Sequence, residues 1–224
     1  MNGEGMWCFM KTGEIPVLYA DDALAVCIKP AGVLSESPGM PALLAAQLGG
    51  EFFCVHRLDR EVGGVMVYAR TRESAAALSA AVAARAAEKT YLAVCCGTPD
   101  ASAGTLRDLL YHDRARNKTY VVQRQRRGVK EAVLDYAVLG TAETAQGVLT
   151  LLRIALGTGR SHQIRVQLAS RRLPLAGDAK YGSPVRSGGI ALWSAALRFA
   201  HPVTGKIMAF KAKPQGGVWE LFGV

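Results

Sequence analysis

Short apolar segments alternate along the chain with turns rich in glycine and proline, and this alternation constrains the fold more than any other feature. Apolar runs of this length, bounded by turn residues, are typical of β-strands. Pro30 ends the first run, because proline cannot continue the hydrogen-bond ladder, and His201–Gly205 forms the turn of a hairpin between the last two. The predicted strands are Ala23–Ile28, Phe52–Val55, Val65–Ala69, Tyr91–Cys96, Glu131–Leu139, Val148–Leu156, Ala191–Phe199 and Lys206–Ala212.

Helical patterns are far fewer than strand patterns. One covers Ala42–Leu48 and stops at two glycines, and a second, rich in alanine, runs to Glu88 with Thr71 as its N-cap. A third begins at Ser161, which is also predicted to be an N-cap. Many strands with only about three helices predict an α+β fold with a largely antiparallel sheet.

The length of 224 residues suits one large domain or two small ones, and it is enough to bury a substantial core. Residues 1–14 look like a loose leader, too short to hold a separate domain. Because no repeat, low-complexity tract or linker divides the rest, we expect residues 15–224 to form a single domain.

The chain is basic, with 27 Lys and Arg against 18 Asp and Glu and a net charge of +9, which favours a polyanionic partner. Between Arg107 and Lys130 lie eight basic residues and two acidic ones, with Tyr111 and Tyr120 among them. This segment suits contact with an RNA backbone and an occasional stacked base, although a solvated hairpin is the alternative. The basic residues nearest one another in the segment are Arg124, Arg126 and Arg127.

Five cysteines occur without a C-x-x-C pair, and they predict reduced thiols in a cytosolic protein. Because His and Cys do not cluster at ligand spacing, we expect no metal site. The sequence has no signal-peptide pattern and no apolar run of roughly 18 residues, so we expect a cytoplasmic protein without membrane contact.

The tetrapeptide His56-Arg57-Leu58-Asp59 places a carboxylate beside two basic residues on a loop between predicted strands. Neighbouring positive charge favours the ionised form of a carboxylate, and carboxylates act as covalent nucleophiles. A surface Arg–Asp pair in a turn is the alternative.

The segment from Gly157 to Val166 starts with a glycine-rich turn and continues into the third helix, where His162 and Arg165 would share one face. Helix N-termini beside arginine attract phosphate, and Arg165 could pair with a carboxylate from elsewhere in the chain. A short amphipathic helix with a solvated polar face is the alternative. The turn-rich segment Leu173–Gly182 follows, and it is of the kind that shapes a pocket wall.

Five ordered elements of this sequence resemble the RluA-type pseudouridine synthase family, from about residue 15 to about residue 213. They are Lys29-Pro30-Ala31-Gly32, His56–Asp59, Lys89-Thr90-Tyr91, Gly159–Val166 and Pro174–Gly182. The resemblance implies a mixed, bifurcated sheet flanked by helices and loops, with an active-site cleft across its middle. It also implies an isomerase that converts a uridine in structured RNA (rRNA or tRNA) to pseudouridine without metal, nucleotide or flavin.

By the same resemblance, Asp59 is the nucleophile, Tyr91 stacks on the target base and acts as acid or base, and Arg165 pairs with Asp59. Arg57 is the candidate to fill the space that an extruded base leaves. The remaining candidates, which contact phosphate or the flipped nucleotide or only support the loop, are Arg160, His162 and Gln163. Tyr91 as a core strand residue is the alternative to its catalytic role. A monomer is expected.

Two departures from the family pattern stand out. Val62-Gly63-Gly64 replaces the usual Thr-Ser-Gly, and Trp193-Ser194-Ala195 replaces the usual Leu-His-Ala. They favour, as a rival hypothesis, an inactive RNA-binding protein on the same scaffold. A carboxylate hydrolase would need a paired acid, and only Glu61 is near Asp59 in sequence.

Overall fold

The computed structural model describes residues 13–224, which divide into two compact units. Unit 1 runs to Lys89 and includes Trp193–Gln215, whereas unit 2 comprises Thr90–Leu192 and Gly216–Val224. The leader predicted at residues 1–14 lies almost wholly outside the described residues. The single domain expected over residues 15–224 stays a prediction.

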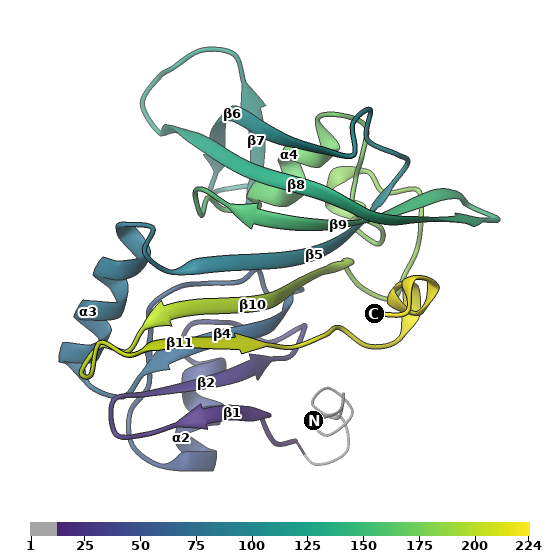
Figure 1. Cartoon of the computed structure of the whole chain (residues 1–224). Coiled ribbons are helices and arrows are strands. Elements are labelled where there is room, and N and C mark those ends of the chain that lie inside the picture. Colours follow the sequence, from purple (N-terminus) through teal and green to yellow (C-terminus); the bar gives the residue numbers. More distant parts are fainter. Residues whose placement is uncertain (1–12) are drawn as a thin grey trace. The chain divides into compact units, whose positions relative to one another are not determined.

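The described part of unit 1 contains a mixed sheet and the helices α2 and α3 (Figure 1). The strands run in the order β1-β2-β4-β10, while β3 pairs with β4 and β11 with β10. Among these described strands, β4 and β10 are parallel, and the other pairs are antiparallel. The elements are β1 (Val17–Ala20), β2 (Leu24–Lys29), α2 (Met40–Leu48), β3 (Phe53–Cys54), β4 (Gly63–Ala69), α3 (Arg72–Ala83), β10 (Leu192–Ala200) and β11 (Ile207–Lys211).

Every residue of β4 is buried, which explains why its sequence is a continuous apolar run and not an alternating one. The core of unit 1 takes alternate residues from its strands, such as Val65 and Val67 of β4, and adds Leu78 from α3. Phe199 of β10 is also part of this core and stacks on Phe210 of β11.

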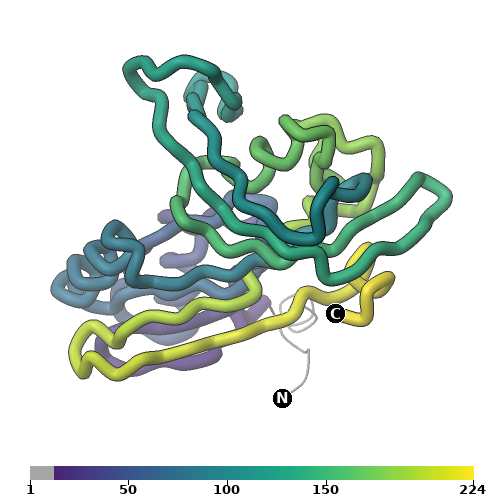
Figure 2. Tube along the Cα trace, turned by 45° about the horizontal axis from the view of Figure 1, so that its top comes forward, coloured from purple at the N-terminus to yellow at the C-terminus, as the bar shows by residue number. Residues whose placement is uncertain are grey.

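Unit 2 is built on an antiparallel sheet in the order β5-β9-β8-β6-β7. Figure 2 follows its long β8–β9 hairpin, which turns at residues 144–147. Helix α4 packs Val166 against Leu110 of β6 and Ala132 of β8. The elements are β5 (Glu88–Cys96), which begins at the end of unit 1, β6 (Ala103–Asp113), β7 (Lys118–Val122), β8 (Val129–Thr144), β9 (Gly147–Leu156), α4 (Gln163–Ala169), η1 (Ala179–Tyr181) and η2 (Gly217–Phe222).

The predicted α+β class and the eight predicted strands are confirmed, with ends that differ by a few residues. Thr71 is the N-cap of α3, and its Oγ1 accepts the Ser74 N–H at 3.1 Å, as predicted. This helix is shorter than predicted, since an end at about Glu88 was expected. The helix stops at Ala83 because Arg85 adopts a left-handed conformation (φ 62°), and the Ala86 N–H then bonds back to the Ala81 carbonyl.

The predicted N-cap at Ser161 is also wrong. Helix α4 begins at Gln163, and its N-cap is His162, which has a left-handed backbone (φ 53°) and makes no capping hydrogen bond with its side chain. Instead, the carbonyl of Ser161 accepts a hydrogen bond from Oγ1 of Thr119 on β7. A hydrogen bond from a distant strand therefore fixes this turn, and such a contact cannot be predicted from the local sequence.

The basic segment forms the β6–β7 hairpin and the loop that leads to β8. Four cysteines within residues 13–224 are free thiols, namely Cys27, Cys54, Cys95 and Cys96. Cys8 lies outside the described residues. No helix within residues 13–224 is long and apolar enough to cross a membrane.

Candidate active site

The loop from Val55 to Val62 carries Asp59 and follows β3, which is held against β4. His56, near the start of this loop, is buried, and its Nε2 accepts the Val67 N–H of β4 at 3.3 Å. Burial, with a smaller contribution from the positive charge of Lys89, holds the pKa of His56 well below its ordinary value. His56 is therefore a neutral imidazole that anchors the start of the loop.

Ser35 fixes the residue directly before Asp59. Its buried hydroxyl donates to the Leu58 carbonyl at 2.9 Å and accepts the Leu58 N–H at 3.0 Å. The hydroxyl of Tyr68, on β4, donates in turn to the Ser35 carbonyl at 3.0 Å. Because both backbone groups of Leu58 are satisfied within the protein, the position of the next peptide unit is well defined.

Lys29 fixes the residue directly after Asp59. Its side chain is fully buried, and its ammonium donates to three carbonyls, those of Pro30, Val33 and Arg60, at 2.9, 2.7 and 3.1 Å. Burial lowers the pKa of Lys29 to about 8, although the carboxylates of Glu61 and Asp59 favour its charged form. The ammonium thus joins the Lys-Pro-x-Gly turn to the Asp59 loop.

Asp59 itself is half-buried, and its carbonyl accepts the Val62 N–H at 3.0 Å in a tight turn. Arg57 is exposed and forms an ion pair with Glu36 at 3.1 Å. An exposed pair of this kind contributes little to stability, so Arg57 can exchange its partner at small cost.

In unit 2, Arg165 is buried on α4 and forms a two-pronged ion pair with Asp178, which is fully buried. Nε lies 2.7 Å from Oδ2, and Nη2 lies 2.9 Å from Oδ1. The guanidinium also lies 5.1 Å from the centre of the Tyr181 ring, within the range of a cation–π contact. Two bonds and one ring face therefore fix the orientation of Arg165.

The hydroxyl of Tyr181 joins three parts of unit 2. It lies 2.9 Å from Nδ1 of the buried His162, and it accepts the Thr119 N–H of β7 at 2.9 Å. It also lies 3.2 Å from the Thr119 carbonyl. The short helix η1 thereby ties the turn before α4 to β7 of the basic hairpin.

Gln163 organises the glycine-rich turn from within. Its Oε1 accepts the Thr158 hydroxyl at 2.7 Å and the Arg160 N–H at 3.0 Å, and its Nε2 donates to the Val133 carbonyl at 3.0 Å. Gln163 is buried, so its side chain supports the loop. The Arg160 side chain, which is partly exposed, donates through Nε to the Glu131 carbonyl.

Tyr91 lies on β5, buried and opposite Ile154 of β9. It belongs to unit 2 together with Arg165, whereas Asp59 belongs to unit 1. The pairing of Asp59 with Arg165 therefore stays a prediction.

The three arginines of the basic segment are exposed in the loop between β7 and β8. Arg126 lies over the ring of Tyr111, at 4.9 Å from its centre. The structure brings the three into one loop of unit 2, and their contact with RNA stays a prediction.

Sequence reasoning assigned no role to Lys29, Asp178 or Tyr181, although all three lie within motifs that it identified. Their position within these motifs could have identified them as candidate site residues. Their contacts could not be foreseen, because lysine and aspartate are rarely fully buried.

Comparison with known proteins shows the family to which the chain is related. The family model described as RNA pseudouridylate synthase matches residues 23–170. A ribosomal large subunit pseudouridine synthase D of Xanthomonas campestris is 33% identical over 225 residues, covering 86% of this chain and 64% of that protein. A tRNA pseudouridine synthase C of Vibrio parahaemolyticus is 29% identical, covering 93% of this chain and 94% of that protein.

Among solved structures, human RNA pseudouridylate synthase domain containing 1 aligns with a TM-score of 0.78 and 21% identity, over 90% of this chain and 84% of that one. This likeness concerns the fold. The chain spans about two thirds of the length of the first curated relatives that it matches.

Proposed function

Because the chain belongs to the RNA pseudouridylate synthase family, whose members are isomerases that act on RNA, we propose that it converts a uridine of rRNA or tRNA to pseudouridine. The relatives' names, a ribosomal large subunit synthase and a tRNA synthase, support these two classes of substrate. The family prediction made from the five motifs is confirmed.

One observation carries the assignment of Asp59 as nucleophile. The peptide units on both sides of Asp59 are held by buried polar side chains, Ser35 before it and Lys29 after it. A surface turn would need neither of these contacts, and a buried lysine is costly to retain. Such a loop suits a carboxylate whose position matters, because catalytic groups depend on a fixed geometry.

In the proposed reaction, the bond from N1 of uracil to C1′ of ribose breaks, the base rotates, and a bond from C5 to C1′ forms. C5 loses a proton and N1 gains one, so the composition and oxidation state of the RNA do not change. Asp59 forms the transient covalent bond that permits detachment. Tyr91 stacks on the base and transfers the proton, and Arg165 orients the Asp59 carboxylate.

Substitution of Asp59 by Asn tests the proposal. Asn keeps the size of the side chain but is not a nucleophile, so pseudouridine formation should fall below detection while RNA affinity stays within a few-fold of wild type. The assay incubates purified protein with RNA from cells that lack it and maps pseudouridine chemically. The matched control is Glu61→Gln, which neutralises an exposed carboxylate in the same turn and should retain activity.

Full activity of the Asp59→Asn variant would refute the mechanism. Binding of RNA by the wild-type protein without any pseudouridine would instead favour the rival function, an inactive RNA-binding protein. Variants of Arg165 are less informative, because removal of this side chain leaves the buried Asp178 carboxylate without its cation and costs about 3–5 kcal/mol of folding free energy.

We further propose that the protein acts as a cytoplasmic monomer. The four free thiols within residues 13–224 support a reducing compartment.

A further inference from the structure

Arg172 has a backbone conformation that normally selects glycine. Helix α4 ends in a Schellman motif, in which the Leu173 N–H bonds to the Leu168 carbonyl and the Arg172 N–H to the Ala169 carbonyl. Arg172 therefore occupies the left-handed position, with φ at 63°. A side chain there strains the backbone, and strained residues concentrate at functional sites.

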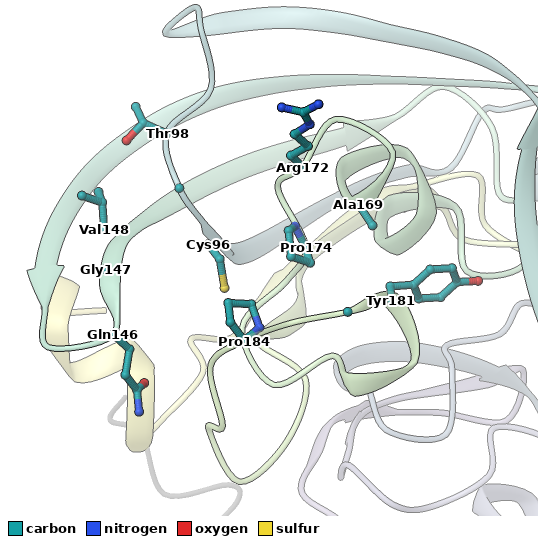
Figure 3. A pocket seen from close by; sticks show the side chains of 12 residues that line it. Cys96, Thr98, Gln146, Gly147, Val148, Ala169, Arg172, Pro174, Tyr181 and Pro184 are labelled. Atoms are coloured by element: carbon teal, nitrogen blue, oxygen red, sulfur yellow. The ribbon is translucent and has the colours of Figure 1, made fainter.

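The side chain of Arg172 lines a pocket of about 650 Å³ in unit 2 (Figure 3). Arg172 is the one charged residue among those that form the pocket. Pro174 and Pro184 contribute apolar surface, and Thr98 and Gln146 contribute a hydroxyl and an amide. The pocket is open to solvent, and polar and apolar groups contribute about equally to its lining, so it offers a charged group and apolar surface side by side.

The charge of Arg172 is not neutralised by an acidic side chain of residues 13–224. Its neighbour Arg171, in contrast, pairs with Asp108 at 2.9 Å. Arg172 is exposed and makes no hydrogen bond through its guanidinium within the described chain, so an anion can reach it. The net charge of +9 gives the protein a general preference for polyanions.

We propose that this pocket binds one unpaired nucleotide of an RNA strand, with its phosphate on Arg172 and its base against the two prolines. The inference rests on the proposed action on RNA and adds a second contact site to it, which adjoins the predicted site residue Arg165 through Tyr181. The base must be unpaired, because a paired base is not available to enter a pocket. A free inorganic anion would need no cavity of this size.

Replacing Arg172 by Gly gives a test in which stability and affinity change in opposite directions. Glycine relieves the backbone strain, so the Tm of the variant should equal or exceed that of wild type. Affinity for a fluorescein-labelled oligouridylate, measured by fluorescence anisotropy, should fall about twofold to fivefold, as expected for one exposed charged contact. The slope of log affinity on log salt should also shrink by about 0.7, the value for one phosphate of a single strand.

Arg85→Gly is the matched control. Arg85 is exposed, ends α3 in the same Schellman motif with φ at 62°, and contributes to no described pocket. This variant removes the same charge and relieves the same strain, and its affinity for oligouridylate should stay that of wild type. Equal losses of affinity in both variants would reduce the effect to net charge and overturn the proposal, as would unchanged affinity of Arg172→Gly.

A second variant tests the pocket and not only its arginine. Thr98→Glu places a carboxylate on the wall without removing a described hydrogen bond, and it should weaken oligouridylate binding at least as much as Arg172→Gly. Wild-type affinity of Thr98→Glu would also overturn the proposal.

The proposed function is tested by a different experiment, the pseudouridine assay, so its failure can be told apart from failure of the pocket inference. If wild-type protein forms pseudouridine and Arg172→Gly binds RNA normally, only the pocket inference is wrong. If no pseudouridine forms, the contrast between Arg172→Gly and Arg85→Gly still decides whether the pocket binds RNA.

Discussion

Gly63 and Trp193 lie in the two segments that differ from the motif pattern expected from the sequence, and they lie opposite each other. Gly63 pairs with Trp193, and Gly64 with Ser194, in the parallel register of β4 and β10. A Cβ atom on Gly63 would lie 2.6 Å from Cζ3 of Trp193, which is too close for any side chain. The large indole of Trp193 therefore occupies the space that a side chain at position 63 would need.

We predict that Gly63→Ser destabilises the protein by about 1–3 kcal/mol, the usual cost of overpacking a core. Trp193→Leu should be destabilising alone, because it leaves a cavity and removes the 2.9 Å bond from the indole to the Ala212 carbonyl. Combined, the two changes should cost less than the sum of their separate effects, as measured by urea unfolding of all four proteins. Additive free energies would show that the two sites are independent.

At the scale of elements, the turn between β1 and β2 is tied to the turn after β10. Nε2 of His201 lies 2.8 Å from Oδ2 of Asp21, and Nδ1 of His201 accepts the N–H groups of Val203 and Thr204. Because Nδ1 accepts hydrogen bonds, the ring hydrogen is on Nε2, which donates a hydrogen bond to the Asp21 carboxylate. One carboxylate thus joins two turns that are 180 residues apart in sequence.

This contact predicts a dependence of stability on pH. Burial alone would raise the pKa of Asp21, but hydrogen bonds from the Tyr19 hydroxyl, His201 and the Leu24 and Ala23 N–H groups outweigh it and lower the pKa to about 2. A lowered carboxyl pKa stabilises the fold above the unfolded value near 4, and this stabilisation disappears as the pH falls through 2. Asp21→Asn should therefore lose about 1–2 kcal/mol at neutral pH and progressively less below pH 4.

Urea unfolding of both proteins between pH 7 and pH 2.5 measures this difference. A difference in unfolding free energy that stays constant over that range would contradict the prediction.

Elements could be predicted from sequence where the signal is local. The hairpin turn at His201–Gly205 and the Thr71 cap are examples, since residues within a few positions of each other determine them. The parallel pairing of β4 with β10 could not be predicted, because its partners are about 130 residues apart and no local pattern identifies them. The same holds for Lys29 and Asp178, whose burial depends on partners supplied by distant parts of the chain.

On the scale of the whole molecule, positive charge is the property that most concerns its partner. The loop with Arg124, Arg126 and Arg127 presents three exposed cations with little acidic compensation. Exposed cations of this kind bind phosphates without regard to sequence and release counterions in doing so.

We predict that reversal of these three arginines to Glu weakens RNA binding across sequences and flattens the slope of log affinity on log salt by up to about 2, or 0.7 for each of three lost phosphate contacts. The matched control reverses Lys206, Lys211 and Lys213, which are also exposed, and gives the same change in net charge. A similar flattening in both proteins would indicate that only the net charge matters, and the loop would then be a solvated surface.

The contact between η1 and β7 also bears on how the protein avoids self-association. Strand β7 is last in the order β5-β9-β8-β6-β7, and such an edge offers unpaired backbone groups to which another chain can add a strand. Here the Tyr181 hydroxyl engages both the N–H and the carbonyl of Thr119, and the ammonium of Lys180 binds the carbonyl of Asn117. The backbone groups of Thr119 on β7 are thereby bound by the chain's own side chains, which opposes strand addition at this point of the edge.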